Sequence, residues 1–266
     1  MINTKTLAIL LCVLTAFLVE AQQNSMGVVN YGHKESFGMG APIGIDYNAN
    51  LVFNSKESSY LFASDSLEGK HIREMKTFRK SDKAVFLIQM KTSPKGYIYN
   101  LIREENMMLA KDLHDFYVKD SIPSIAWDIK EETKVIGGLS CTKAEASFNG
   151  RDYTAWFTFE IPLPYGPWKL NGLPGIILEA YDTNKEIFFY FKSIEYPSKN
   201  ELFITKPFLS DKKSEWISSL EYAKGLKAVH IRKQKVGMML SEQSPNANSS
   251  RQFAPMLKFN LESFDE

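Results

Sequence analysis

Residues 165–179 read YGPWKLNGLPGIILE, and this stretch decides the fold more than any other part of the chain. It contains two prolines and three glycines that control the backbone: Pro167, Pro174, Gly166, Gly172 and Gly175. The prolines fix φ and remove two amide donors, so neither can lie in the middle of a paired strand. The glycines permit positive φ, and Pro174-Gly175 suits the centre of a type II turn. The stretch is therefore predicted to form a rigid loop that closes with a tight turn before an apolar strand.

The apolar side chains of this stretch leave two interpretations open. Its anchors are Trp168, Leu170 and Leu173. Either Trp168 caps the open end of a β core while the glycines let backbone pass close by, or the loop is a rigid platform for a ligand or partner. The stretch contains no nucleophile, metal-binding set or acid/base pair. A strand follows it, whereas a glycine-rich phosphate loop is followed by a helix.

Composition narrows the class of protein. The chain has 266 residues, 44% hydrophobic and 13% aromatic, enough to bury a large core in one large β domain or two small ones. Its 32 basic and 31 acidic residues give a net charge of +1, without the basic excess of a nucleic-acid-binding protein. The four histidines are isolated and lack metal-binding spacing, so no metal and no cofactor are predicted.

The first 21 residues have the features of a secretory signal peptide. Lys5 precedes an apolar run at residues 7–18 that is too short to span a bilayer comfortably, and residues 19–21 have the form of a cleavage site. Cleavage is predicted after Ala21, and no later apolar run is long enough for a transmembrane helix. One cysteine, Cys141, then remains, so no intrachain disulfide is predicted and the thiol is expected to be buried and inert.

From residue 84 onward the sequence signal for β-strands becomes stronger. Short apolar runs separated by turn residues predict a mainly β fold. The clearest element is a hairpin of residues 139–148 and 151–159, joined by Asn149-Gly150, because a type I′ turn needs positive φ at both central positions. A second hairpin is predicted from residues 175–182 and 186–196.

Three other stretches are assigned from their local composition. Residues 33–47 are rich in glycine and are predicted to form a long loop, and the charged residues 130–134 are predicted to interrupt the strands. A helix is predicted over residues 211–224, with Ser210 as its N-cap and its end near Gly225.

The expected organisation is a signal peptide at residues 1–21, a single β-rich domain at 22–240, and a polar linker with a last strand at 241–266. The expected fold is mainly β: a strongly curved antiparallel sheet with one C-terminal helix. It is either an unclosed barrel like that of periplasmic lipoprotein carriers or a two-sheet sandwich. Both alternatives leave a concave apolar face.

Residues 172–177, GLPGII, resemble the name-giving motif of the GLPGLI proteins, exported envelope proteins of the Bacteroidetes, with one Leu-to-Ile exchange. The resemblance is tightest between residues 136 and 182. Further landmarks there are Cys141-Thr142-Lys143-Ala144, Gly150-Arg151, Thr154-Ala155-Trp156-Phe157, Glu160-Ile161-Pro162 and Gly166-Pro167-Trp168. It implies an exported protein of the periplasm or cell surface, with a TonB-dependent outer-membrane receptor or another envelope protein as partner. The resemblance implies no particular reaction.

The favoured functional hypothesis is non-enzymatic binding of a hydrophobic ligand, a peptide or an envelope protein. The residues expected near such a site are Trp156, Trp168 and Leu173. An aromatic, rigid loop beside an aromatic-rich sheet, without a catalytic set, supports this hypothesis.

Two other functional classes stay open. One is a secreted hydrolase of peptide or glycan, with Glu160 or Glu179 as its acid; the other is a structural cell-surface protein. Arg151 is expected to form a structural ion pair with one of these two carboxylates.

Overall fold

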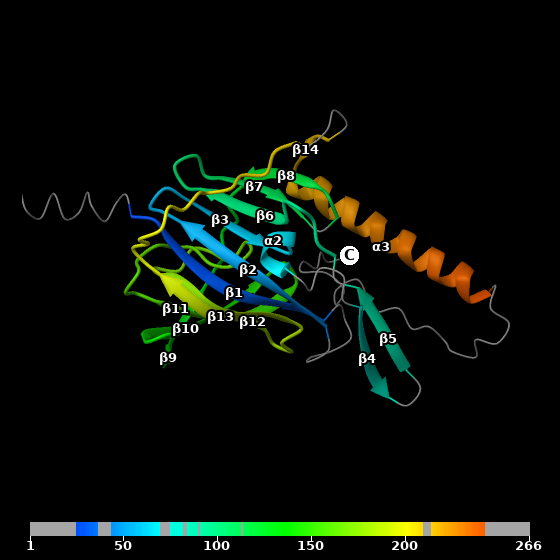
Figure 1. Ribbon diagram of the computed structural model, residues 1–266, viewed down its shortest axis with the longest axis horizontal. Helices are drawn as coiled ribbons and strands as arrows, with labels where there is room; N and C mark the ends of the chain where they lie inside the picture. The colour runs from blue at the N-terminus through cyan, green and yellow to red at the C-terminus, as the bar shows by residue number, and fades with distance from the viewer. Residues whose placement is uncertain are drawn as a thin grey trace, which may run out of the picture.

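The structure is a computed structural model that describes residues 25–36, 44–69, 75–81, 84–89, 91–112, 114–209 and 214–242 (Figure 1). The predicted signal peptide and the predicted last strand lie outside the described residues.

The described residues form fourteen strands and two helices. The strands of the N-terminal half are β1 (Gly27–Glu35), β2 (Ile45–Phe53), β3 (Glu57–Phe62), β4 (Met75–Ser81), β5 (Ala84–Gln89), β6 (Tyr97–Ile102), β7 (Met107–Lys111) and β8 (Tyr117–Ser121). Those of the C-terminal half are β9 (Asp128–Ile136), β10 (Leu139–Phe148), β11 (Arg151–Thr158), β12 (Ile176–Asp182), β13 (Ile187–Glu195) and β14 (Trp216–Ile217). The helices are α2 (Asp65–Glu68) and α3 (Ser219–Glu242).

Twelve strands form one sheet in the order β14-β8-β7-β6-β3-β2-β1-β13-β12-β11-β10-β9, and β4 and β5 form a separate hairpin. All pairs in the large sheet are antiparallel except β14 with β8. Strands β14 and β9 are its two ends, so the sheet is open. The predicted mainly β class with a C-terminal helix is therefore confirmed.

The expected strong curl, as in an unclosed barrel, is not found, and neither is a sandwich of two separate sheets. Strands β6 and β11 lie six positions apart in the order of the sheet, yet the sheet bends enough for Tyr99 of β6 and Tyr153 of β11 to pack against the same side chain. Both rings lie 6.3 Å from the ring of Trp168, in the connection between β11 and β12. This connection fills the space between the two halves of the sheet, which limits how far they approach.

The hairpin at Asn149-Gly150 is confirmed. The φ angles of the two residues are 46° and 72°, and Phe148 pairs with Arg151 across the turn. Phe159, the last residue of the predicted second strand, is 55% exposed, and β11 ends one residue earlier at Thr158. The second predicted hairpin is also present, as β12 and β13.

Two stretches that were predicted to be irregular contain strands. The ends of residues 33–47 belong to β1 and β2, which pair along their whole described length. Residues 130–134 lie inside β9, where charged side chains are tolerated because this edge strand is largely exposed. Across the β9–β10 pair, Lys143 binds Glu132 at 3.1 Å.

Helix α3 begins later and ends later than predicted. Its N-cap is Ser218, whose hydroxyl accepts from the amide of Glu221 at 3.2 Å while the Glu221 carboxylate accepts from the amide of Ser218 at 2.8 Å. This reciprocal pair is a capping box. Gly225 lies inside the helix, where a Cβ would come within 2.7 Å of the Phe116 ring, so this glycine permits close packing and does not end the helix.

An extended segment, residues 199–209, connects the sheet to β14 across the outer face of β3. Its Thr205 carbonyl accepts from the Ser59 hydroxyl at 2.7 Å, and Lys206 binds Glu57 at 2.6 Å. The segment covers part of the outer face of the sheet.

Candidate functional site

The connection between β11 and β12, here called the central loop (residues 159–175), is part of the core. Trp168 and Leu173 are each 1% exposed and Leu170 is fully buried. Backbone bonds hold the loop in shape, since the Gly172 amide donates to Pro164 at 3.1 Å and the Ile177 amide donates to Tyr165 at 2.9 Å. The structure therefore matches the interpretation in which Trp168 caps the β core.

The glycines of the central loop act differently from expectation. Only Gly172 has a positive φ, 92°, and the other positive φ in the loop belongs to Trp168, at 57°. Because Gly175 lacks a positive φ, the predicted type II turn at Pro174-Gly175 is wrong. Gly175 is needed because a Cβ would overlap the backbone carbonyl of Thr158, and at Gly166 a Cβ would lie 2.7 Å from the Ile177 side chain. Close approach thus explains these two glycines.

The three predicted binding residues do not form one site. Trp168 and Leu173 lie inside the bend of the sheet, whereas Trp156 lies on the outer side by strand alternation. The ammonium of Lys134 lies 4.3 Å from the centre of the Trp156 ring and 2.7 Å from the Glu179 carboxylate. Trp156 is 8% exposed under this lysine.

Arg151 forms a buried ion pair, but not with the expected partners. Its guanidinium lies 2.6 Å from Asp182 and 3.6 Å from Glu186. Antiparallel pairing places the start of β11 beside the end of β12, which brings Asp182 nearest. Glu160 instead accepts from the Ser140 amide at 2.9 Å.

The described residues offer no assembled catalytic set. Glu179 is held by Lys134, and burial raises the pKa of the Cys141 thiol to about 11, which keeps it protonated at neutral pH. Within the described ranges, no group of three or more histidine, cysteine, aspartate or glutamate side chains lies close enough to hold a metal ion.

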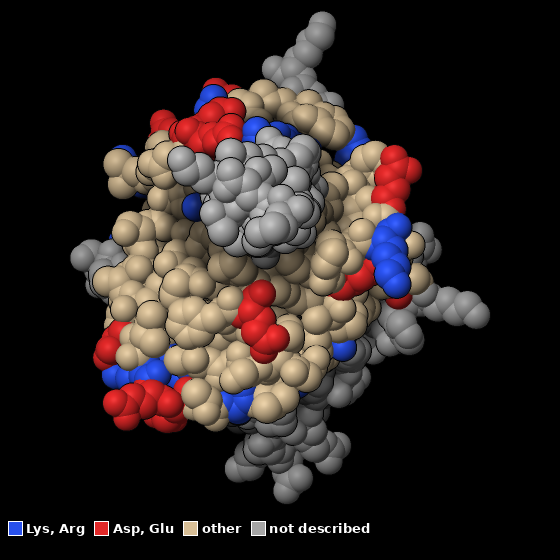
Figure 2. Space-filling model, turned by 90° about the vertical axis from the view of Figure 1, so that its left-hand side faces the viewer, with Lys and Arg blue, Asp and Glu red and all other residues tan. Residues whose placement is uncertain are grey.

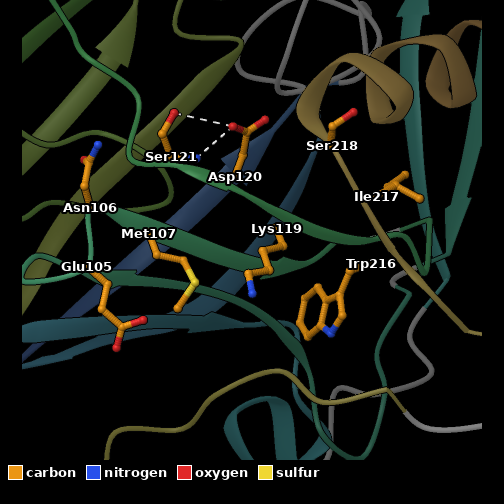
Figure 3. Close-up of a pocket in the computed structure, with 9 residues that line it drawn as sticks. All are labelled: Glu105, Asn106, Met107, Lys119, Asp120, Ser121, Trp216, Ile217 and Ser218. Atoms are coloured by element: carbon orange, nitrogen blue, oxygen red, sulfur yellow. Dashed lines mark hydrogen bonds between the residues drawn. The ribbon is translucent and has the colours of Figure 1, made fainter.

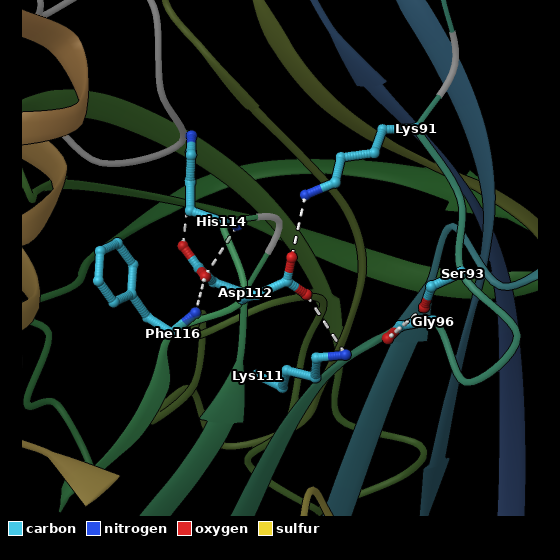
Figure 4. Close-up of polar contacts among 8 residues, drawn as sticks. Lys91, Ser93, Gly96, Lys111, Asp112, His114 and Phe116 are labelled. Carbon is cyan, nitrogen blue, oxygen red and sulfur yellow. Dashed lines mark hydrogen bonds and ion pairs between the residues drawn. The ribbon is translucent and has the colours of Figure 1, made fainter. Parts of the chain in front are cut away.

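His114 has a local structural role (Figure 4). The buried carboxylate of Asp112 accepts from the amides of His114 and Phe116 at 2.9 and 2.8 Å and lies 3.2 Å from the His114 ring. Beside it, Asp115 forms 3.4 Å ion pairs with Lys91 and Lys111. This turn positions Phe116, whose ring packs against α3.

A buried polar cluster on β1 was not predicted from the sequence. His33 is fully buried, with its Nδ1 atom 3.1 Å from the Tyr60 hydroxyl and its Nε2 atom 3.0 Å from the Glu35 carboxylate. Burial raises the pKa of Tyr60 well above its ordinary value. The alternation of Tyr31, His33 and Glu35 along one strand face was the available signal, but residues 33–47 were assigned to a loop. The cluster is enclosed by aromatic side chains, with the rings of Phe62 and Phe189 4.3 and 4.7 Å from that of His33.

A groove of about 470 Å³ opens on the outer surface at the end of the sheet (Figure 3). This outer groove is lined by Glu105, Asn106, Met107, Lys119, Asp120, Ser121, Trp216, Ile217 and Ser218. Its walls come from the turn before β7, from β7 and β8, and from β14 with the start of α3. These segments lie far apart in the sequence, and the parallel pairing of β14 with β8 brings them together.

The outer groove combines an aromatic ring with charged side chains. Trp216 packs edge-on against Tyr117 at 5.9 Å and stays partly exposed next to Met107 and Lys119. Asp120 accepts from the Ser219 amide at 2.9 Å; this bond, above all, lowers the pKa of its carboxyl below the usual value. Asp120 therefore holds the start of α3. Among the described strands none pairs with the second edge of β14, which is the end strand of the sheet.

Charge elsewhere on the surface is mixed. On the face shown in Figure 2, acidic and basic residues lie in small groups separated by uncharged surface. None of the described helices is long and apolar enough to cross a membrane.

Comparison with known proteins finds a family match for one part of the chain. Residues 147–179, which include β11, the central loop and the start of β12, match the family model described as "Protein of unknown function (Porph_ging)". The match covers the segment that holds the core together and leaves out the outer groove. A search of curated proteins finds no match to this chain.

Two solved structures of PNGF-II, in the C2 and P21 space groups, show a distant likeness. Each is 14% identical, with TM-scores of 0.45 and 0.46, and the match covers 75% of this chain. The chain corresponds to 32% of the length of PNGF-II. A likeness of this size shows neither a common fold nor a common activity.

Proposed function

We propose that this chain is an exported envelope protein of the GLPGLI type that binds a peptide segment of an envelope partner without catalysing a reaction. The N-terminal signal-like segment supports export to the periplasm or cell surface. The GLPGII motif at residues 172–177 lies within the segment that matches the Porph_ging family model, which supports the GLPGLI assignment. A TonB-dependent outer-membrane receptor is the partner that the resemblance implies.

The observation that carries this proposal is the contrast between the filled interior and the outer groove. Trp168 and Leu173 occupy the inside of the bend, so a hydrophobic ligand would have to displace the core to reach them. The outer groove instead is lined by a partly exposed ring, Trp216, and by the thioether of Met107. Aromatic and methionine side chains are common anchors for partner side chains.

A peptide fits the outer groove better than a compact hydrophobic molecule. The free edge of β14 offers backbone donors and acceptors to an extended strand. The exposed side chains of Lys119 and Glu105 can pair with charges of either sign along that strand. A hydrophobic ligand without hydrogen-bonding groups would leave these features unused.

Removing the ring of Trp216 is expected to weaken partner binding by about tenfold or more, because central aromatic anchors dominate small interfaces. A photo-crosslinking residue at position 119 in living cells should capture one envelope protein, and Trp216→Ala in the same chain should abolish that product. The same residue at Val135, which is 72% exposed on the distant edge strand β9, is the matched control. Identical products from positions 119 and 135, or a product unaffected by Trp216→Ala in a folded chain, would contradict the proposal.

A further inference from the structure

Helix α3 is fixed to the protein near its start and then runs clear of the sheet (Figure 1). Tyr222 packs edge-on against Phe116 at 5.6 Å, and the ammonium of Lys169 in the central loop lies 5.1 Å from the Tyr222 ring. Leu226, one turn later, is 2% exposed. These contacts fix one face of the helix toward the protein and leave the opposite face outward.

The outward face carries a regular pattern, here called the basic stripe: Leu220, Lys224, Lys227, Ile231 and Lys235. Spacings of four, three, four and four residues place all five on one side of a helix. Leu220 is 66% exposed and Ile231 is 42% exposed, and the exposed Arg232 borders the stripe. Two apolar side chains therefore stand among cations on a surface that no described residue covers.

The charge of this helix differs from that of the whole protein. Residues 219–242 contain five lysines and arginines and two glutamates, whereas the whole chain has a net charge of +1. Among the described side chains, no carboxylate forms an ion pair with Lys224, Lys227, Arg232 or Lys235. The Glu221 carboxylate is engaged by Ser218 at the helix start. The hydrogen bonds from Ser218 and the charge of Lys224 lower the pKa of the Glu221 carboxyl, so the charge of Lys224 is partly compensated. The stripe as a whole still offers net positive charge to an anionic partner.

We propose that the basic stripe docks α3 lengthwise on the surface of an anionic lipid bilayer. The lysines would contact phosphate headgroups, and Leu220 and Ile231 would enter the interfacial region between them. Lysines beside an anionic surface gain from electrostatic attraction, and each apolar side chain that enters the interfacial region gains by leaving water. Such docking needs no membrane-spanning helix, and it uses a surface separate from the outer groove.

Cosedimentation with vesicles tests this proposal on the chain without residues 1–21, the form expected after export. Vesicles of phosphatidylglycerol and phosphatidylcholine in equal parts should bind the protein, and pure phosphatidylcholine vesicles should not. Lys224→Gln, Lys227→Gln and Lys235→Gln together should weaken binding by about 100-fold, because each cation near an anionic surface contributes a comparable share. High salt should weaken it as well.

A matched charge control removes three exposed lysines from the body of the protein: Lys185, Lys192 and Lys199, each changed to Gln. This control should keep nearly all of the binding. Equal loss in the two triple variants, or no binding of the unchanged chain to the anionic vesicles, would overturn the proposal. Circular dichroism confirms that each variant keeps its helix and melting temperature.

The apolar residues of the stripe distinguish a membrane from a soluble acidic partner. Leu220→Ser with Ile231→Ser should reduce vesicle binding by about tenfold while leaving the charge unchanged. If this pair has no effect, and polyglutamate competes for the stripe as well as the vesicles do, the partner is an acidic polymer and the membrane proposal is wrong.

Discussion

Replacing Gly175 with alanine is expected to lower the free energy of unfolding by about 3 kcal/mol, because the new methyl group has no room. A Cβ at this position would overlap the carbonyl oxygen of Thr158, and the next nearest atoms also belong to the backbone there. A backbone contact cannot be relieved by a change of rotamer, so the junction of β11 and β12 must move. Equilibrium denaturation in urea measures the loss.

Gly172→Ala is the matched control. This residue has a φ of 92°, but a Cβ added there would have no atom within 4 Å, so alanine strains only the local backbone. Its cost is expected to be about 1 kcal/mol. If Gly175→Ala is as stable as Gly172→Ala or more stable, the two strands do not approach as described.

Replacing Arg151 with methionine is expected to cost about 3–5 kcal/mol, because it leaves buried carboxylates without their cation. The Arg151 and Asp182 side chains are each 6% exposed, and Glu186 is 7% exposed. Methionine keeps much of the apolar length of arginine, so the loss reports mainly on the charge. Thermal and urea unfolding at neutral pH measure it.

Lys134→Met provides the comparison for a more accessible ion pair. Lys134 and Glu179 are 34% and 19% exposed, so water compensates for much of the lost contact. A cost of about 1 kcal/mol or less is expected from the pair. If Arg151→Met costs no more than Lys134→Met, the buried cluster at the end of β11 and β12 is not a major source of stability.

Local chemistry made the β elements predictable. Asn149 and Gly150 are residue types that tolerate positive φ, and both have positive φ in the turn. Both hairpins occur where turn residues separate apolar runs. The helix was misplaced because Ser210 and Ser218 are both good N-caps by type. The choice of Ser218 depends on the Glu221 carboxylate and on Asp120, which accepts from an amide 99 residues away.

Long-range packing explains the remaining differences. Turn chemistry is the same whether the central loop stands in solvent or fills the sheet, and only the burial of Trp168 decides between the two. His33 and Glu35 lie in a glycine-rich stretch that predicts a loop, yet both are buried in the core, with the His33 Nε2 atom 3.0 Å from the Glu35 carboxylate. The outer groove depends on the pairing of β14 with β8. This pairing involves only two residues of each strand, and no local sequence pattern predicts it.

The central claim is that the central loop is as much a part of the core as the strands. Hydrogen exchange of individual amides tests it most directly, at Leu170, Gly172, Ile176 and Ile177, which all donate within this region. We expect these amides to exchange as slowly as those in the middle of β1, only through global unfolding. Exchange of the loop amides at the fast rate of the exposed segment 201–204 would contradict the account.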